Sequence, residues 1–241
     1  CDIIQRGGTI LKTARCLEFK DPAVRKVAAD NLKKLGVEGL VVIGGDGSFT
    51  GAKCLSDEQG INVVGIPGTI DNDLAYTDYT LGFDTAVNTV LWAINALRDT
   101  MTSHDRVSLV KVMGRRCGDI ALYAGICGGA EYILVPEVPY DIQKIANEIK
   151  KNREHGKTAN VIVLAEGAGN ENEIKTIVSV ISGTDVKVTT LGHIQRGGSP
   201  SMADRMLAAK FGVHAVNLLM EGKTNRVIGC HGQKTIDLDI T

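Results

Sequence analysis

The clearest indication of the fold is the stretch at residues 40–48, LVVIGGDGS. Its first four residues are apolar without polar alternation, which is typical of a parallel strand buried on both faces. The glycines that follow end this strand in a tight turn, and successive glycines let backbone N–H groups face an anion such as phosphate. We therefore predict a buried strand that leads directly into a ligand-binding turn.

The same pattern recurs along the chain. Apolar runs at 62–66, 107–112 and 161–165 each lead into polar or glycine-rich residues. Between the runs, apolar residues at helical spacing predict helices at about 22–35, 84–100, 119–128, 141–155, 171–181 and 201–221. This alternation indicates an α/β fold with parallel sheets, in which ligands bind at the carboxyl ends of the strands.

The composition is that of an ordinary folded protein, with 241 residues, a net charge of −1, 44% hydrophobic and 23% charged residues. The balanced charge excludes the strongly basic surface of a non-specific nucleic-acid binder. No apolar run is long enough to span a membrane, and the six cysteines form no CxxC pair. We expect a cytoplasmic protein with free thiols that binds neither nucleic acid nor membranes.

Asp46 lies inside the glycine-rich turn at 44–48. A carboxylate at this point would repel a phosphate unless a divalent cation lay between them, so Asp46 is a candidate magnesium ligand. The alternative is a tight turn in which the aspartate serves only as a cap.

Two carboxylates, Asp71 and Asp73, follow the apolar run at 62–66. In a non-helical segment one carboxylate can lie near a metal while the other acts as general base toward a substrate hydroxyl. The alternative is an Asx-rich turn, which is common. The position directly after a predicted buried strand favours the functional interpretation.

Basic residues follow two further predicted strands. Arg115 and Arg116 come after the run at 107–112, where guanidinium groups suit the charge of a transferring phosphoryl group. The segment 192–200, GHIQRGGSP, adds a histidine and an arginine that suit a phosphomonoester pocket. The alternatives are a solvated basic pair and a plain strand-to-helix loop. Trp92 lies on the apolar stripe of its predicted helix, and we expect it to pack in the core.

Together, these motifs resemble the bacterial type of ATP-dependent 6-phosphofructokinase. The residues that carry the resemblance match in order and spacing across essentially the whole chain: Gly7-Gly8-Thr9, Thr13-Ala14-Arg15-Cys16, Gly44 to Ser48, Pro67 to Asp73, Met113-Gly114-Arg115 and Leu191 to Pro200. The expected fold is two similar doubly wound lobes of mainly parallel sheet that face an active-site cleft. We assign residues 1–82 plus 195–241 to a nucleotide-binding lobe and residues 83–194 to a sugar-phosphate-binding lobe.

The resemblance implies transfer of the γ-phosphoryl group of Mg-ATP to the 1-hydroxyl of fructose 6-phosphate. The products are fructose 1,6-bisphosphate and ADP, and the family's reaction is the allosterically regulated, committed step of glycolysis. Asp71 matches the family's catalytic base, with Thr69 and Asp73 in the same loop. Asp46 matches the magnesium ligand, and Arg115 matches the arginine that stabilises the transferring phosphoryl group.

The remaining matches divide among three kinds of site. The nucleotide contacts match Arg15, Cys16, Gly45, Asp46, Gly47 and Ser48. The sugar-phosphate contacts match Thr69, Ile70, Asp71, Met113, Gly114, Arg115, Glu166, His193 and Arg196, with Arg106 and Lys187 reaching into a neighbouring subunit. The effector site, which binds ADP or phosphoenolpyruvate between subunits, matches Arg98, Gly129, Glu131, His155 and Lys157. The resemblance therefore also implies a homo-oligomer, by family habit a tetramer.

The chain departs from the family's pattern at Lys187 and His155, where the family usually has arginine. Lysine keeps the positive charge of arginine but cannot donate two parallel hydrogen bonds to one phosphate. We therefore expect weaker or more salt-sensitive sugar-phosphate binding. If the charge of His155 contributes, effector affinity should change with pH.

Two glycines, Gly47 and Gly68, help to predict whether the phosphoryl donor is ATP or pyrophosphate. Pyrophosphate-using relatives have an aspartate at the position of Gly47, which would crowd a nucleotide, and a lysine at the position of Gly68, which would bind pyrophosphate charge. The glycines therefore favour ATP. The alternatives are a pyrophosphate-dependent enzyme and a non-catalytic regulatory subunit, and the intact Asp46, Asp71 and Arg115 argue against the second.

The family begins with a strand and a Gly-Gly-Asp-x-Pro-Gly turn that complete the nucleotide site, and nothing before Cys1 matches them. The family's last strand and tail also extend further than this sequence. We therefore expect the 241 residues to be part of a longer polypeptide.

Overall fold

The computed structural model describes the chain except for residues 1, 102–105, 158 and 241. The chain forms two compact units, each built on one four-stranded sheet. The first unit comprises Cys1–Thr69, Leu74–Gly82 and Met202–Thr241. The second unit comprises Ile70–Asp73 and Phe83–Ser201. The segment at 70–73 thus belongs by its contacts to the second unit, although the strand before it belongs to the first.

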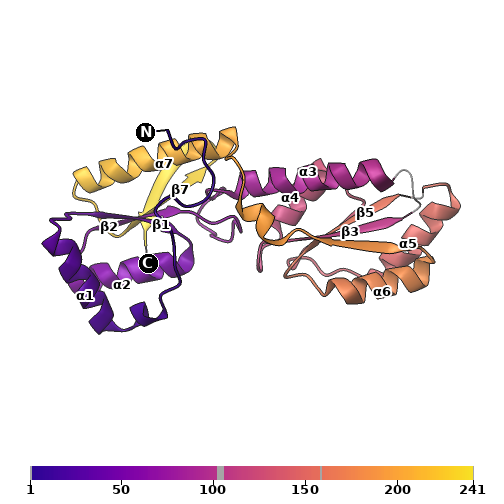
Figure 1. Cartoon of the computed structure of the whole chain (residues 1–241), viewed down its shortest axis with the longest axis horizontal. Coiled ribbons are helices and arrows are strands. Elements are labelled where there is room, and N and C mark those ends of the chain that lie inside the picture. Colours follow the sequence, from indigo (N-terminus) through magenta and orange to yellow (C-terminus); the bar gives the residue numbers. More distant parts are fainter. Residues whose placement is uncertain (1, 102–105, 158, 241) are drawn as a thin grey trace. The chain divides into compact units, whose positions relative to one another are not determined.

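The sheet of the first unit has the strand order β1-β2-β7-β8. Strands β1 (Leu40–Gly44), β2 (Val63–Pro67) and β7 (Arg226–His231) are parallel, and β8 (Lys234–Asp239) closes an antiparallel hairpin with β7. Helices α1 (Pro22–Lys34) and α2 (Asp46–Gln59) pack on one face, and α7 (Met202–Met220) packs on the other (Figure 1).

The alternation of side chains along β2 explains this two-sided packing. Val63 packs with residues of α1 and α2, whereas Val64 and Ile66 pack with α7. Successive side chains of a strand point to opposite faces, so a strand covered by helices on both sides must be apolar throughout. All five residues of β2 are buried, as we predicted for this run.

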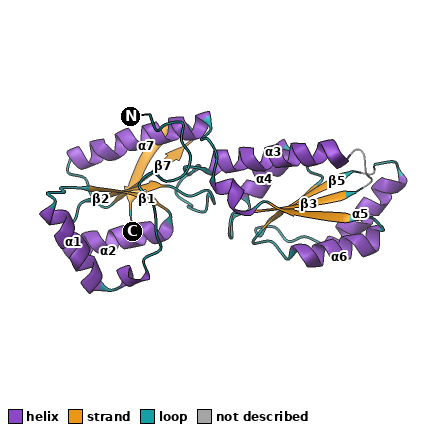
Figure 2. Cartoon of the chain, viewed as in Figure 1, coloured by secondary structure: helices purple, strands orange, loops and turns teal. Residues whose placement is uncertain are grey.

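The sheet of the second unit has the order β4-β5-β3-β6 and is entirely parallel (Figure 2). Its strands are β3 (Val107–Val112), β4 (Tyr132–Leu134), β5 (Asn160–Ala165) and β6 (Val186–Thr190). Helices α3 (Phe83–Met101) and α4 (Asp119–Cys127) share one core with the sheet, and α5 (Ile142–Glu154) and α6 (Glu171–Ser182) share the other. Two 3-10 helices complete the elements, η1 at Leu17–Lys20 in the first unit and η2 at Gly192–Arg196 in the second.

The predicted α/β class with mainly parallel sheets is confirmed, and the predicted helices lie close to their observed bounds. Helix α1 begins as the sequence indicates, because the Asp21 side chain accepts a hydrogen bond from the Ala23 N–H and Pro22 occupies the first turn. Within the described ranges, no helix combines the length and the apolarity needed to cross a bilayer.

Three local expectations were wrong. Ile43, at the end of the edge strand β1, is 57% exposed, whereas Val41 and Val42 pack against the helices on the two faces of the sheet. The turn after β1 is the first turn of α2, which begins at Asp46 itself. Trp92 is 69% exposed, since the buried face of α3 is formed by residues such as Phe83, Val90 and Ile94 on the other side of the helix.

We predict that Phe211→Ala lowers the free energy of unfolding of the first unit by about 3–5 kcal/mol. Phe211 is fully buried between α7 and the sheet, so truncation leaves a cavity. Urea denaturation followed by circular dichroism measures the change. Lys210→Ala, on an exposed position of the same helix, should change stability by less than about 0.5 kcal/mol. Equal effects of the two variants would contradict the packing argument.

Candidate active site

In the first unit, the ends of two adjacent strands bring two candidate segments together. Gly44 at the end of β1 lies opposite Pro67 at the end of β2 in the parallel register. The Gly68 N–H donates to the Gly44 carbonyl oxygen at 2.8 Å. The glycine-rich segment at 44–48 and the segment at 67–69 therefore leave the sheet side by side, at the edge where α/β proteins bind ligands.

Helix α2 begins inside the glycine-rich segment. Gly45 is its N-cap residue in an extended conformation, and the N–H groups of Ser48 and Phe49 donate to the Gly45 carbonyl oxygen. The N–H groups at the start of a helix have no acceptor within it, and they carry the positive end of the helix dipole. A Cβ atom added to Gly47 would meet nothing within 4 Å. The start of α2 is therefore an open anion-binding position.

Asp46 is the exposed first residue of α2. In the part of the chain that the structure describes, no three His, Cys, Asp or Glu side chains form a group that could hold a metal by themselves. Mg²⁺ is commonly held by one or two carboxylates together with substrate phosphates and water. A single exposed carboxylate at an anion-binding helix start fits that mode, so Asp46 fits a magnesium ion bound together with phosphate.

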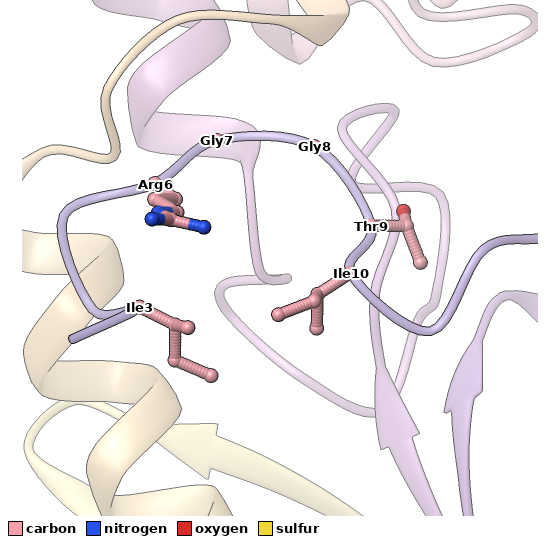
Figure 3. Close-up of a pocket in the computed structure, with 6 residues that line it drawn as sticks. All are labelled: Ile3, Arg6, Gly7, Gly8, Thr9 and Ile10. Carbon is pink, nitrogen blue, oxygen red and sulfur yellow. The ribbon is translucent and has the colours of Figure 1, made fainter. Parts of the chain in front are cut away.

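The other nucleotide-contact candidates of the first unit lie in its amino-terminal segment. Arg15 and Cys16 are exposed and directly precede η1, and the Cys16 thiol lies 3.5 Å from the Glu18 carboxylate. The Gly7-Gly8-Thr9 motif lines a small cavity of about 280 Å³ together with Ile3, Arg6 and Ile10 (Figure 3). All the residues that line this cavity come from one loop.

In the second unit, three strand ends meet at one edge of the sheet. The Glu166 N–H donates to the Val112 carbonyl at 2.9 Å, and the Leu191 N–H donates to the Lys111 carbonyl at 3.1 Å. The residues after β3, β5 and β6 therefore lie side by side. This arrangement brings six of the predicted sugar-phosphate residues to one edge: Met113, Gly114, Arg115, Glu166, His193 and Arg196.

Asp71 and Arg115 form the central ion pair of this edge. Arg115 Nε lies 3.1 Å from Asp71 Oδ2, and the side chains are 63% and 3% exposed, respectively. Burial raises the pKa of Asp71, while the Arg115 and Arg196 guanidinium groups oppose the shift and the Asp73 and Glu166 carboxylates add to it. A buried carboxylate with a raised pKa holds a proton more tightly than an exposed one, which suits a general base.

The backbone of Arg115 is held in an uncommon conformation. Arg115 has a φ of 53°, in the left-handed region that side chains other than glycine rarely adopt. Its N–H donates to Glu166 Oε1 at 2.6 Å. Gly114 before it has a φ of 133°, and a Cβ atom on Gly167 would collide with the Arg115 carbonyl oxygen. Glu166 and the two glycines thus fix the direction in which the guanidinium leaves the backbone.

Gln195 belongs to this edge, although we assigned it no role from the sequence. Its side chain is 1% exposed, Oε1 accepts from the Met113 N–H at 3.2 Å, and Nε2 donates to the Gly192 carbonyl at 3.0 Å. Its neighbours His193 and Arg196 are exposed on the same 3-10 helix. In the sequence, Gln195 is only a polar residue within a basic motif. Its burial in the structure distinguishes it from His193 and Arg196.

Two predicted sugar-phosphate residues lie at the opposite edge of the sheet. Arg106 precedes β3 and Lys187 lies near the start of β6, and both contact Asp185, at 3.8 and 2.9 Å. The Lys187 ammonium holds the pKa of Asp185 below its ordinary value. A strand rises by about 3.3 Å per residue, so β3 alone separates Arg106 from Arg115 by roughly 20 Å. Arg106 and Lys187 therefore do not join the Asp71 edge of their own unit.

Three of the five predicted effector residues, Arg98, Gly129 and Lys157, gather around a fourth, Glu131, whose side chain is mostly buried. Lys157 Nζ lies 3.2 Å from Glu131 Oε1, and Arg98 Nη2 lies 3.7 Å from Glu131 Oε2. Arg98 also donates to the carbonyl oxygens of Gly128 and Gly129. His155 follows the end of α5 two residues before Lys157, and its Nδ1 lies 2.7 Å from the Lys151 carbonyl oxygen.

Comparison with known proteins places this geometry in one family. The family profile described as Phosphofructokinase matches residues 1–219. The ATP-dependent 6-phosphofructokinase of Clostridium tetani is 61% identical over 239 residues, which cover 99% of this chain and 75% of that protein. ATP-dependent 6-phosphofructokinase 1 of Clostridium perfringens is 59% identical over the same shares. A solved phosphofructokinase from Saccharomyces cerevisiae aligns with a TM-score of 0.92 at 34% identity, over 98% of this chain and 36% of that one.

We predict that Gly167→Ala raises the pKa of Asp71 further and destabilises the second unit by about 1–3 kcal/mol. The new methyl group would push the Arg115 carbonyl away and weaken the ion pair that opposes the raised pKa. Carboxyl NMR titration of labelled aspartates and urea denaturation measure the two effects. Gly197→Ala is the matched control, because its Cβ meets only the Ile194 carbonyl at 4.0 Å. An unchanged Asp71 pKa in Gly167→Ala would contradict the prediction.

Proposed function

The chain belongs to the phosphofructokinase family, and we propose that it transfers the γ-phosphoryl group of ATP to the 1-hydroxyl of fructose 6-phosphate. The products are fructose 1,6-bisphosphate and ADP, which makes the chain a glycolytic phosphotransferase. The observation that carries the proposal is the buried Asp71 carboxylate paired with an exposed Arg115 guanidinium. Asp71 can accept the proton of the substrate hydroxyl, and Arg115 can balance the negative charge of the phosphoryl group.

Asp71 accepts the proton of the attacking hydroxyl. Its carboxylate is buried, so the proton relieves the cost of a charge removed from water. Arg115 binds Asp71 through Nε, and the guanidinium has five N–H donors, so its exposed nitrogens remain suited to phosphoryl oxygens. As the hydroxyl loses its proton, Arg115, which is paired with Asp71, balances the developing charge.

The start of α2 binds the phosphates of ATP. Backbone N–H groups around Gly45 and Gly47 would hold phosphate oxygens, and Asp46 would hold Mg²⁺. When bound, Mg²⁺ neutralises part of the negative charge on the transferring group. Arg15, Cys16 and Ser48 complete the nucleotide contacts that we propose for the first unit.

The second unit binds the sugar phosphate. The backbone around Met113 and Gly114, together with Glu166, His193 and Arg196, lies at the strand ends that surround Asp71. The exposed His193 and Arg196 supply donors for a phosphomonoester, and Thr69, Ile70 and Asp73 flank the base in the chain. We thus assign the nucleotide to the first unit and the sugar phosphate to the second.

Arg106 and Lys187 serve a neighbouring subunit in this proposal, because both lie at the far edge of their own sheet. Their position supports a homo-oligomer, which we propose to be a tetramer. The cluster of Arg98, Glu131 and Lys157 is the proposed effector site for ADP or phosphoenolpyruvate, with Gly129 and His155 beside it. We propose that the enzyme acts in the cytoplasm, because its reaction belongs to glycolysis.

We predict that Asp71→Asn lowers kcat by about 10³-fold or more while fructose 6-phosphate still binds, because the amide cannot accept the hydroxyl proton. Coupled measurement of ADP release gives kcat, and calorimetry gives sugar-phosphate affinity. A small fall in kcat would exclude Asp71 from the role of base.

Asp71→Asn also changes how the free energy of unfolding depends on pH. A raised folded-state pKa contributes stability below the unfolded value of about 3.9, and this contribution is lost as pH rises through the folded pKa. The stability of Asp71→Asn relative to the wild type should therefore increase as pH rises from about 3 to 7.

We predict that Gly47→Asp raises the Michaelis constant for ATP by about tenfold or more without changing the fold. The added side chain meets no protein atom within 4 Å of its Cβ, so its effect falls on the ligand. Steady-state kinetics at saturating fructose 6-phosphate measure the constant, and Gly47→Asn separates bulk from charge. An unchanged constant in Gly47→Asp would contradict the argument for ATP over pyrophosphate.

A further inference from the structure

Asn72, between the two carboxylates of the 70–73 segment, has a φ of 53°. Residues other than glycine adopt this left-handed conformation at a cost of order 1 kcal/mol, although asparagine tolerates it better than most. The conformation sets the direction of the chain on either side, and therefore the directions of Asp71 and Asp73. Contacts elsewhere in the second unit must hold it in place.

Two contacts bind Asn72 to the first residue of α4 and to the segment before it. Its side-chain Nδ2 donates to Asp119 Oδ2 at 2.7 Å. Its carbonyl oxygen accepts from the Cys117 thiol, with Sγ at 3.7 Å. The first contact is charge-assisted and short, which makes it the stronger of the two. Side chain and backbone of Asn72 are thus both attached to residues 117–119.

Asp119 is itself fixed to a rigid element. It is the first residue of α4, where the helix dipole stabilises a negative charge. The preceding Gly118 donates its N–H to Glu137 Oε1 at 2.7 Å, and a Cβ atom on Gly118 would lie 2.5 Å from Glu137 and Val135. Ile120 directly after it is fully buried in the core beneath α4. The Asp119 carboxylate therefore has little freedom to follow a moving segment.

We propose that Asp119 is a positioning residue that holds the 70–73 segment through Asn72 and thereby sets the place of the Asp71 carboxylate. In this proposal Asp119 does not contact the substrate or the reacting atoms, and it acts through the Asn72 amide. This inference rests on the proposed function for its effect on turnover. The simpler alternative is that Asp119 only stabilises the start of α4, as acidic residues often do in the first turn of a helix.

The test compares Asp119→Ala, Asn72→Gly and the double variant. Glycine keeps the left-handed conformation accessible and removes only the amide, and Asn72→Gly leaves the charge of Asp119 in place. We expect each single variant to lower kcat by about 10- to 100-fold with Michaelis constants changed less than about threefold, because a displacement of about 1 Å can have that effect. The double variant should lose no more than the worse single variant, since both remove one interaction.

Asp141→Ala is the matched control. Asp141 also carries a carboxylate at a helix start in the same unit, where it caps α5 by accepting from the N–H groups of Gln143 and Lys144. It should lower stability by about 1 kcal/mol and leave kcat unchanged. Equal losses of kcat in Asp141→Ala and Asp119→Ala would overturn the proposal, and so would additive losses in the double variant.

A second measurement is independent of turnover. Carboxyl NMR titration should show the pKa of Asp71 moving toward its ordinary value in both Asp119→Ala and Asn72→Gly, because a released segment lets water reach the carboxylate. Asp141→Ala should leave it unchanged. An Asp71 pKa that stays at the wild-type value in Asn72→Gly would overturn the proposal even if the wild-type chain showed no turnover, so this failure is distinct from a failure of the proposed function.

Discussion

Parallel pairing of the strands is the constraint on which the functional residues depend. Because parallel strands end at the same edge, the segments after β1 and β2 lie side by side in the first unit. The segments after β3, β5 and β6 do the same in the second unit. At this edge no strand needs a functional side chain of its own, since each only delivers its following segment there. The same geometry sends Arg106 to the opposite edge.

In the second unit, backbone strain and charge are concentrated around Asp71. Asn72 and Arg115 both have left-handed backbones, and a carboxylate on a neighbouring element accepts a hydrogen bond from each, Asp119 from the Asn72 amide and Glu166 from the Arg115 N–H. Asp71 lies between them as a buried charge beside Arg115. Each of these features is unfavourable alone, and all of them require a tightly packed surrounding to persist. The core of α3, α4 and the sheet supplies it.

The two cation clusters of the second unit differ in a way that their residue types do not reveal. Around the mostly buried Glu131, Arg98 is also held by backbone carbonyls and Lys157 by the carboxylate, which fixes the charges in space. Asp185, which pairs with Arg106 and Lys187, is itself 52% exposed, whereas Glu131 is 15% exposed, and exposed ion pairs are weak. The first cluster is organised within the unit, whereas the second is free to exchange its carboxylate for another anion.

The sequence by itself determined the α/β class, the positions of most helices and the family, because apolar periodicity, caps and ordered motifs are local properties of a chain. It also made Asp46, Asp71 and Arg115 candidates, since carboxylates and guanidinium groups directly after apolar runs are visible as residues. Only the tertiary structure showed that Asp119 holds Asn72, that Gln195 is buried beneath Met113, and that Ile43 and Trp92 are exposed. These facts depend on which strand lies at an edge and which elements pack together, and contacts between residues distant in sequence leave no local pattern.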